Sequence, residues 1–447
     1  MSRSQLEYSG RLDAEYYRHS YLKYEALLKS RGSQPLAFFA NFLIGPFGSA
    51  FTVENYTSDK SYRYIRGKDV KPMSLMSDDC VYMPKRDFDR LSRYALKKND
   101  LLVSVVGTVG NTALIEQTDI PAIFSCKSAA IRAQNINPHY LLAYLNSKFG
   151  HDLLLRKQRG AVQQGLNLDD LKTLDIYIPN ADLQMAIERI YKKSTEIKNK
   201  AKDHYTQAEA LLLQTLGMAN FAPSKEAVNI KSFKDSFASS GRLDAEYYQP
   251  KYEDMVARIK SGAHVCLGDA VTIQKSIEPG SDAYVDEGED GLPFLRVADF
   301  SKHGLTSPQK KLSQAFVNAH DDAINLSKPR SGRKLTIDEL KPRKDAILFS
   351  KDGSVGEAYC LREDANYITS GAVLHLTVKD KSKLLPDYLT LALNSVLVRT
   401  QAERDAGGSI ILHWRTGEIA KVVVPLVDLA MKHLHNSRKN PDGVSEV

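Results

Sequence analysis

Two polar loops, one in each half of the chain, carry the side chains best suited to contact the edges of nucleic-acid bases. The first runs from Arg156 to Leu171 and the second from Arg399 to Ile419. Arginine binds guanine through two hydrogen bonds, glutamine pairs similarly with adenine, and lysine and arginine also hold phosphates. A solvated polar loop without a ligand has the same composition. The candidate DNA-contacting residues are Lys157, Arg159, Gln163, Gln164, Arg404, Ser409, His413 and Arg415.

A glycine-punctuated loop follows a buried strand-like run in each half. These loops are Ser104–Thr112 (SVVGTVGNT) and Ser350–Ala358 (SKDGSVGEA). Glycine lets a backbone approach a phosphate closely and offer N–H donors to it, although a tight turn also requires glycine. The candidate contact residues here are Ser104, Thr108, Ser350 and Lys351.

Two basic stretches, Lys60–Lys68 and Lys328–Lys334, could line a phosphate track. Charge runs are also common on solvated faces. The candidate residues are Arg63, Arg66, Lys68, Arg330 and Arg333, together with Arg296, the counterpart of Arg66 in the second half. We expect Trp414, the only tryptophan, to lie in the core or at a subunit contact.

An internal duplication organises these loops. The segment SGRLDAEYY occurs at Ser9–Tyr17 and again, unchanged, at Ser240–Tyr248. Weaker matches follow in the same order: RYIRGKDV with PFLRVADF, NDLLVSVVGTVGNTAL with KDAILFSKDGSVGEAY, and IYIPNADLQ with VVVPLVDLA. The second copy is longer by about 16 residues between Phe300 and Lys344, a stretch that is polar and basic. The chain therefore consists of two homologous units.

Each copy alternates short strand-like runs with turn residues and places one helix-like segment near its end. This pattern predicts an α+β fold: two homologous domains of mainly antiparallel strands, separated by a long coiled-coil-like helix. The helix is predicted because residues Ala181 to Leu216 include neither glycine nor proline and carry apolar residues at intervals of three and four. It would span about 50 Å. Its apolar seam, a candidate for subunit docking, includes Leu183, Ile187, Ile190, Ile197 and Leu211.

Composition excludes several classes of protein. The chain has 447 residues and 61 basic against 54 acidic side chains, a surplus of +7 that permits an anionic partner without requiring one. The four cysteines are widely separated, which excludes a disulfide scaffold or a zinc site of local spacing and suits the cytoplasm. The most apolar stretch, Pro35 to Phe51, is interrupted by glycine and proline, so a buried segment is expected and not a membrane span. No nucleotide-binding, methyltransferase, protease or nuclease motif is found, so we expect a non-catalytic protein.

The order of motifs resembles a known family. GPFGSAF, YIRGKDV, NDLLVSVVGTVGNTAL, GAVQQGLNLDDL and LDIYIPNADLQMAI precede the long helix, and the second copy repeats RVADF, DAILFSKDGSVGEA and VVVPL. This arrangement is similar to the specificity (S) subunit of type I restriction-modification systems, which has two target-recognition domains. The resemblance covers roughly residues 9–439.

The resemblance implies a role and a set of partners. Each target-recognition domain would bind one half of a split sequence in double-stranded DNA, and because the two copies differ, the target would be asymmetric. The helices would dock two methyltransferase (M) subunits, which carry S-adenosylmethionine and methylate adenine N6. A restriction (R) subunit, where present, would supply ATP- and magnesium-dependent translocation and cleavage. No cofactor or metal is expected in this chain.

The resemblance also suggests the domain boundaries. They are an N-terminal repeated segment (1–34), the first target-recognition domain (35–180), the spacer helix (181–217), a linker with the second repeated segment (218–262), the second target-recognition domain (263–425) and a short distal helix with a polar tail (426–447). The family has a second long helix in the last position, so this one is predicted to be truncated. The alternative function is a non-catalytic scaffold in another phage-defence complex.

Overall fold

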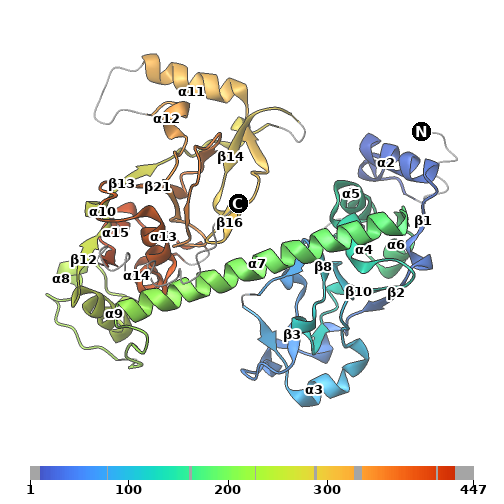
Figure 1. The fold of residues 1–447 in the computed structure, drawn as a ribbon, viewed down its shortest axis with the longest axis horizontal. Coiled ribbons are helices and arrows are strands. Elements are labelled where there is room, and N and C mark those ends of the chain that lie inside the picture. Colours follow the sequence, from blue (N-terminus) through green and yellow to red (C-terminus); the bar gives the residue numbers. More distant parts are fainter. Residues whose placement is uncertain are drawn as a thin grey trace, which may run out of the picture. The chain divides into compact units, whose positions relative to one another are not determined.

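The structure, a computed structural model, describes residues 11–77, 79–160, 164–226, 228–285, 289–326, 335–408 and 411–427. The predicted distal helix lies largely outside these residues. The chain divides into two compact units, Met1–Lys198 and Asn199–Val447, and each is described by itself (Figure 1).

A four-stranded antiparallel sheet forms the centre of the first unit. Its order is β2 (Ala40–Ile44), β10 (Ser128–Ala133), β7 (Leu101–Ser104) and β8 (Thr112–Leu114). Alternate residues of a strand point to opposite faces. One face of the sheet accordingly packs against the leucines of α4 (Pro138–Asn146) and α5 (Lys148–Arg156). The other face packs against a smaller sheet.

The smaller sheet of this unit has the order β6 (Val81–Tyr82), β3 (Arg63–Ile65), β9 (Ala122–Phe124), and β3 pairs with β9 in parallel. Two short antiparallel pairs complete the unit's strands, so antiparallel pairing predominates as expected. These pairs are β4 (Val70–Lys71) with β5 (Ser74–Leu75) and β1 (Gln34–Pro35) with β11 (Asp175–Ile176). The remaining helices of the domain are α2 (His19–Ser30), α3 (Lys85–Arg90) and α6 (Leu168–Lys172).

The second unit repeats this topology strand for strand. Its four-stranded sheet has the order β13-β21-β18-β19, its three-stranded sheet the order β17-β14-β20, and its two pairs are β15-β16 and β12-β22. The duplication and the α+β class predicted from the sequence are therefore confirmed. The strands are β12 (His264–Cys266), β13 (Val271–Lys275), β14 (Leu292–Leu295), β15 (Phe300–Ser301), β16 (Gly304–Leu305), β17 (Lys310–Leu312), β18 (Ile347–Ser350), β19 (Ala358–Cys360), β20 (Ile368–Thr369), β21 (Val373–Val378) and β22 (Val423–Pro425).

The helices of the second unit follow the same plan, except in the predicted insertion. The six-residue helix α3 of the first unit is replaced by the thirteen-residue α11 (Gln314–Leu326), which is followed by α12 (Ile337–Leu340). The other helices are α8 (Phe237–Ser240), α9 (Pro250–Lys260), α10 (Leu267–Ala270), α13 (Pro386–Asn394), α14 (Val396–Asp405) and α15 (Thr416–Ile419).

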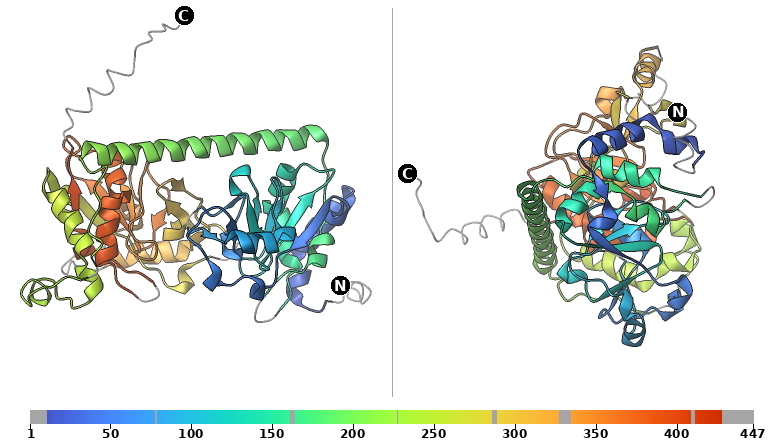
Figure 2. Two further views of the ribbon diagram at one scale, coloured as in Figure 1. Left: turned by 90° about the horizontal axis from the view of Figure 1, so that it is seen from below. Right: turned by 90° about the vertical axis from the view of Figure 1, so that its right-hand side faces the viewer.

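The long helix predicted between the copies is α7, which runs without interruption from Ala181 to Thr215 over 35 residues (Figure 2). Ile187 packs against the core of the first unit, and Leu212 belongs to a core cluster of the second. Of the described residues, no helix is both long and apolar enough to cross a membrane.

Trp414 lies in the core of the second unit, one of the two locations expected for it. Only 1% of its surface is exposed, and its ring centroid is 5.8 Å from that of Phe349 on β18. The loop that carries His413 and Arg415 is therefore anchored by a large buried side chain between them.

A buried histidine should make the second unit sensitive to acid. His375 on β21 is 3% exposed and lies 2.9 Å from the Thr369 hydroxyl, and burial lowers its pKa to about 4. An unfolded histidine titrates near pH 6.5. The unfolded state therefore binds more protons between these values, and the free energy of unfolding should fall by up to about 3 kcal/mol as the pH drops from 6.5 to 4.

Denaturant unfolding at pH 5 and pH 7 measures this effect. The His375→Gln variant should lose most of the pH dependence in the second unit, whereas His264→Gln, at an exposed position, should retain it. The equivalent position of the first unit is Ala130, which cannot titrate. An unchanged pH dependence in His375→Gln would contradict this assignment.

Candidate nucleic-acid interface

The two recurring loops of the first unit, which are about 50 residues apart in sequence, lie side by side. The Leu166 amide donates to the Val105 carbonyl at 2.9 Å, and Val106 and Gly165 form an isolated antiparallel bridge. The glycine-punctuated loop and the helix-following loop therefore form one paired-loop site at the end of β7.

The second unit contains the same paired-loop site. The Gly353 amide donates to the Leu412 carbonyl at 2.9 Å, and the Trp414 amide donates to the Lys351 carbonyl at 2.8 Å. Asp352 and His413 form the isolated bridge, and the His413 Nδ1 lies 2.9 Å from an Asp352 carboxylate oxygen. Both copies thus bring together two loops that are separate in the sequence.

The serines at the start of the glycine-punctuated loops have a structural role. Ser104 and Ser350 are fully buried, and their hydroxyls donate to the carbonyls of Thr108 and Ser354 within the same loops. This placement argues against the DNA contact predicted for both serines, because the hydroxyls already bond inside the loop. Gly107 and Gly353 have φ values of +89° and +73°, which disfavour other residues.

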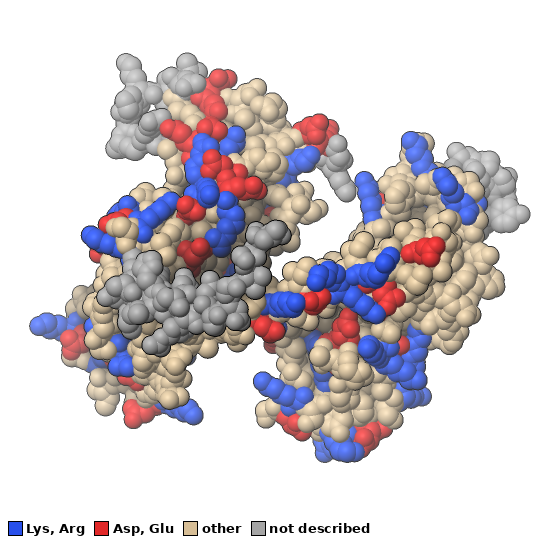
Figure 3. Space-filling view, viewed as in Figure 1, with Lys and Arg blue, Asp and Glu red and all other residues tan. Residues whose placement is uncertain are grey.

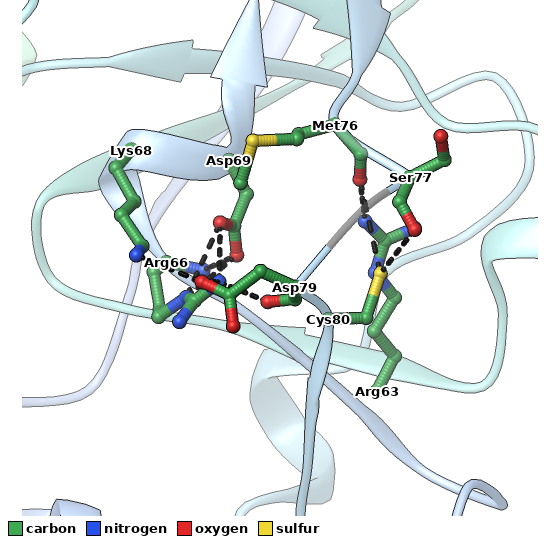
Figure 4. Close-up of polar contacts among 8 residues, drawn as sticks. All are labelled: Arg63, Arg66, Lys68, Asp69, Met76, Ser77, Asp79 and Cys80. Atoms are coloured by element: carbon green, nitrogen blue, oxygen red, sulfur yellow. Dashed lines mark hydrogen bonds and ion pairs between the residues drawn. The ribbon is translucent and has the colours of Figure 1, made fainter. Parts of the chain in front are cut away.

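The basic cluster before the first glycine loop is largely neutralised within its own domain, and Figure 4 shows Arg66 and Lys68 with their partners Asp69 and Asp79. Arg63 is 12% exposed and binds Asp119 at 2.8 Å, while Arg66 is 18% exposed and binds Asp69 at 2.9 Å and also Asp79. Burial raises the pKa of Asp119. The DNA contacts predicted for Arg63 and Arg66 therefore fit this geometry poorly.

Lys68 is the exposed member of that cluster, with 59% of its side chain accessible and Asp79 at 3.0 Å. In the second unit, Arg296 occupies the equivalent turn, with Nε 3.5 Å from Asp299 and 40% of the side chain exposed. The Lys68–Asp79 pair is exposed on both sides and contributes little stability, so a phosphate can replace that carboxylate at small cost. Asp299, in contrast, is 7% exposed and also accepts from the Arg296 amide.

Six candidate residues present exposed side chains. Arg159 is 61% exposed with Asp170 at 3.2 Å, and His413 is 63% exposed. Lys68 belongs to the same group. The others are Thr108, Gln164 and Arg415. Because Arg159, Gln164 and Thr108 come from adjoining loops, they form a compact set of donors and acceptors.

Three further candidates are engaged with their own domain. Lys157 donates to the Thr173 hydroxyl at 2.9 Å, and burial lowers its pKa. Lys351 is 14% exposed and pairs with Asp352. Arg404 is 22% exposed and pairs with Asp405 at 2.7 Å. Four candidates, Gln163, Arg330, Arg333 and Ser409, lie outside the described residues.

Of the five apolar residues predicted to form the seam on α7, one packs against its own unit and four are exposed. Ile187 contacts the first unit. Four other apolar residues are exposed by 48 to 71%: Leu183, Ile190, Ile197 and Leu211. Lysine and arginine side chains, with acidic side chains among them, gather along the face of α7 seen in Figure 3, and two of the lysines, Lys192 and Lys193, form ion pairs with Glu188 and Glu196 of the same helix.

The repeated segment contacts the paired-loop site in both units, a contact that was not predicted from the sequence. Arg11 donates to backbone carbonyls at the start of the helix-following loop, and Arg242 does so in the second unit. The unchanged repetition of SGRLDAEYY is the sequence feature that could have indicated this contact. Among the described residues, no group of three or more histidine, cysteine, aspartate or glutamate side chains could hold a metal ion.

Comparison with known proteins relates part of the chain to a known family. Residues 48–207 match the family model for the type I restriction modification DNA specificity domain. This match confirms the resemblance drawn from the sequence: the matched region, which holds most of the first domain and much of α7, belongs to the type I restriction-modification specificity family. No curated protein matches the sequence.

Solved structures of low sequence identity are also similar. The S subunit of the type I restriction-modification system from M. genitalium is 13% identical, with a TM-score of 0.39, covering 88% of this chain and 84% of its own. The HsdS subunit from Thermoanaerobacter tengcongensis is 16% identical, with a TM-score of 0.27, covering 91% and 87%. The type IIG restriction endonuclease BpuSI is 10% identical, with a TM-score of 0.32, covering 43% and 30%.

Proposed function

We propose that this protein is the DNA-recognition subunit of a type I restriction-modification complex. The observation that carries the proposal is the paired-loop site, which occurs once in each unit with the same backbone bonds and with polar side chains exposed at its rim. A shared backbone frame with exposed arginine and glutamine suits hydrogen bonding to base edges. The family match over residues 48–207 supports the same role.

The recognised sequence should be bipartite and asymmetric. In the first unit the closed part of the loop carries Arg159 and Gln164, whereas the corresponding positions of the second unit are Gly407 and Leu412. His413 and Arg415 supply the second unit's exposed polar side chains. Different donors and acceptors select different bases, so each unit would bind its own half-site.

Methylation and cleavage of the DNA would be catalysed by partner subunits. The exposed stripe on α7 is suited to dock methyltransferase subunits, two by the family pattern, which bring S-adenosylmethionine and methylate adenine N6. A restriction subunit with ATP and magnesium would join such a complex where one exists. This protein would contribute sequence recognition without catalysis, and it would act in the cytoplasm, where the DNA lies.

The most direct test compares genome-wide adenine methylation in the source strain with and without this gene. Deletion should abolish methylation at one bipartite motif while leaving other methylated motifs unchanged, and a plasmid copy of the gene should restore it. Unchanged methylation in the deletion strain would refute the proposal. The alternative of a scaffold predicts weak DNA binding without the steep salt dependence that phosphate contacts produce.

A further inference from the structure

The nine-residue segment shared by both copies, SGRLDAEYY, carries none of the residues proposed to contact bases. Its described part in the first unit, Arg11–Tyr17, leads into α2, which packs on α5. In the second unit the equivalent segment, Arg242–Tyr248, leads into α9, which packs on α14. In both units it therefore lies beside the helix that enters the paired-loop site.

In the first unit the segment bonds directly to the loop backbone. The Arg11 guanidinium is held by both carboxylate oxygens of Asp13, each at 2.6 Å, which fixes its orientation. The same guanidinium donates to the carbonyls of Gln158 at 2.8 Å and Lys157 at 3.4 Å. These carbonyls follow the last turn of α5, where helix carbonyls lack intrahelical partners and a cation is favoured.

An aromatic ring supports this contact. Tyr16 lies between two guanidinium groups, with Arg11 at 4.8 Å and Arg156 at 4.2 Å from its ring centroid. Arg156 is 8% exposed, and its Nε donates to the Tyr16 carbonyl at 2.9 Å. The end of α5 and the repeated segment are thus joined through side chains that have little freedom to move.

The second unit reproduces the arrangement with its own residues. Arg242 binds both oxygens of Asp244, at 2.9 and 2.5 Å, and donates to the Asp405 carbonyl at 3.1 Å. Tyr247 lies 4.5 Å from Arg242 and 5.3 Å from Arg404. The contact to the loop backbone is therefore a shared property of the two copies.

The bonded carbonyls lie at the entrance of the loop that carries the exposed polar residues. Arg159 and Gly165 exchange two backbone hydrogen bonds, at 3.0 and 2.9 Å, and close the loop. Gly407 and His413 do the same at 3.1 and 2.7 Å. A shift of residues 157 and 158 would displace the closed loop that follows them.

We propose that the repeated segment is a clamp that positions the base-contacting loop in each unit, with Arg11 and Arg242 as its positioning residues. The proposal rests on the proposed function, because it assigns these arginines a role in half-site recognition without contact to DNA. The clamp also explains why the segment is repeated unchanged. It bonds to the loop backbone, which is alike in both copies, whereas the bases would be contacted by side chains that differ between the copies.

The experiment selects bound sequences from a random-sequence duplex DNA library with the full chain and its variants. Arg11→Ala should lower the affinity for the selected sequence about tenfold through the first half-site alone, and Arg242→Ala should do so through the second. Arg18→Ala, which removes an exposed cation directly after the segment, serves as the matched control and should leave both half-sites unchanged. Asp13→Asn, which loosens the guanidinium and keeps its charge, gives a second test if Arg11→Ala fails to fold.

A double-variant cycle separates positioning from a general role in folding. If Arg11 acts through the loop, Arg11→Ala should cost no further affinity in a chain that already carries Arg159→Ala and Gln164→Ala. Loss of both half-sites in Arg11→Ala, or an effect equal to that of Arg18→Ala, would overturn the clamp. A wild-type chain that selects no sequence would overturn the proposed function itself, and the clamp with it.

Discussion

Replacement of Arg159 and Gln164 by alanine is expected to lower the affinity for the first half-site about a hundredfold and to leave the second half-site unchanged. Both side chains are exposed at the rim of the first paired-loop site, and a well-formed base contact discriminates by about 1–3 kcal/mol. The fold should tolerate the change, because Asp170, which is 6% exposed, still accepts a hydrogen bond from the Asn167 amide at 3.0 Å when the Arg159 side chain is removed.

Competition binding with duplexes altered in one half at a time measures this effect. Lys172→Ala is a suitable control, since it removes a partly exposed cation from the neighbouring helix α6 without touching the loop rim. The control should weaken binding to all sequences slightly and equally. Equal loss at both half-sites in the double variant would indicate misfolding and contradict the assignment.

Replacement of Ile190 and Ile197 by glutamate is expected to prevent co-purification of the methyltransferase subunit. These residues are 71% and 54% exposed, and with Leu183 and Leu211 they recur at multiples of seven residues along α7. This spacing is typical of a seam that packs against another helix. Placing two charges within such a contact removes apolar burial and adds the cost of desolvating the carboxylates.

Affinity purification of the tagged chain from its own strain, followed by quantification of the bound methyltransferase, provides the measurement. Lys202→Glu changes the charge of the same helix on another face, because Lys202 follows Ile197 by five residues and so lies about 140° round the helix from it, and this variant should retain the partner. DNA binding by the glutamate variant should persist. A complex recovered in normal yield from the double variant would show that the docking surface lies elsewhere.

The parts of the fold that depend on local pattern could be predicted from the sequence. The limits of α7 differ from the predicted helix by two residues or fewer, because 3–4 apolar spacing and the absence of glycine and proline are local signals. The duplicated strand order followed from the repeated motifs, which kept their sequence order in both copies.

Whether an individual candidate side chain is exposed or already paired depends on tertiary contacts, which the local sequence pattern does not reveal. Arg63 is neutralised by Asp119, a residue 56 positions away. Arg66 is neutralised by the nearby Asp69 and also by Asp79, 13 positions away. The hydroxyl of Ser104 turns inward because the tight glycine loop brings the Thr108 carbonyl to it. A polar residue type indicates that a side chain can contact DNA, but only the tertiary structure shows whether it is free to do so.

The backbone bonds that close the helix-following loop have a consequence for how recognition can change. In both units five residues separate the closing pair, 160–164 between Arg159 and Gly165 and 408–412 between Gly407 and His413. Each stretch begins with a glycine of positive φ, at +105° and +135°. The two stretches are thus equal in length, and we expect substitutions within either one to change which side chains are offered to the bases without breaking the backbone bonds that close the loop.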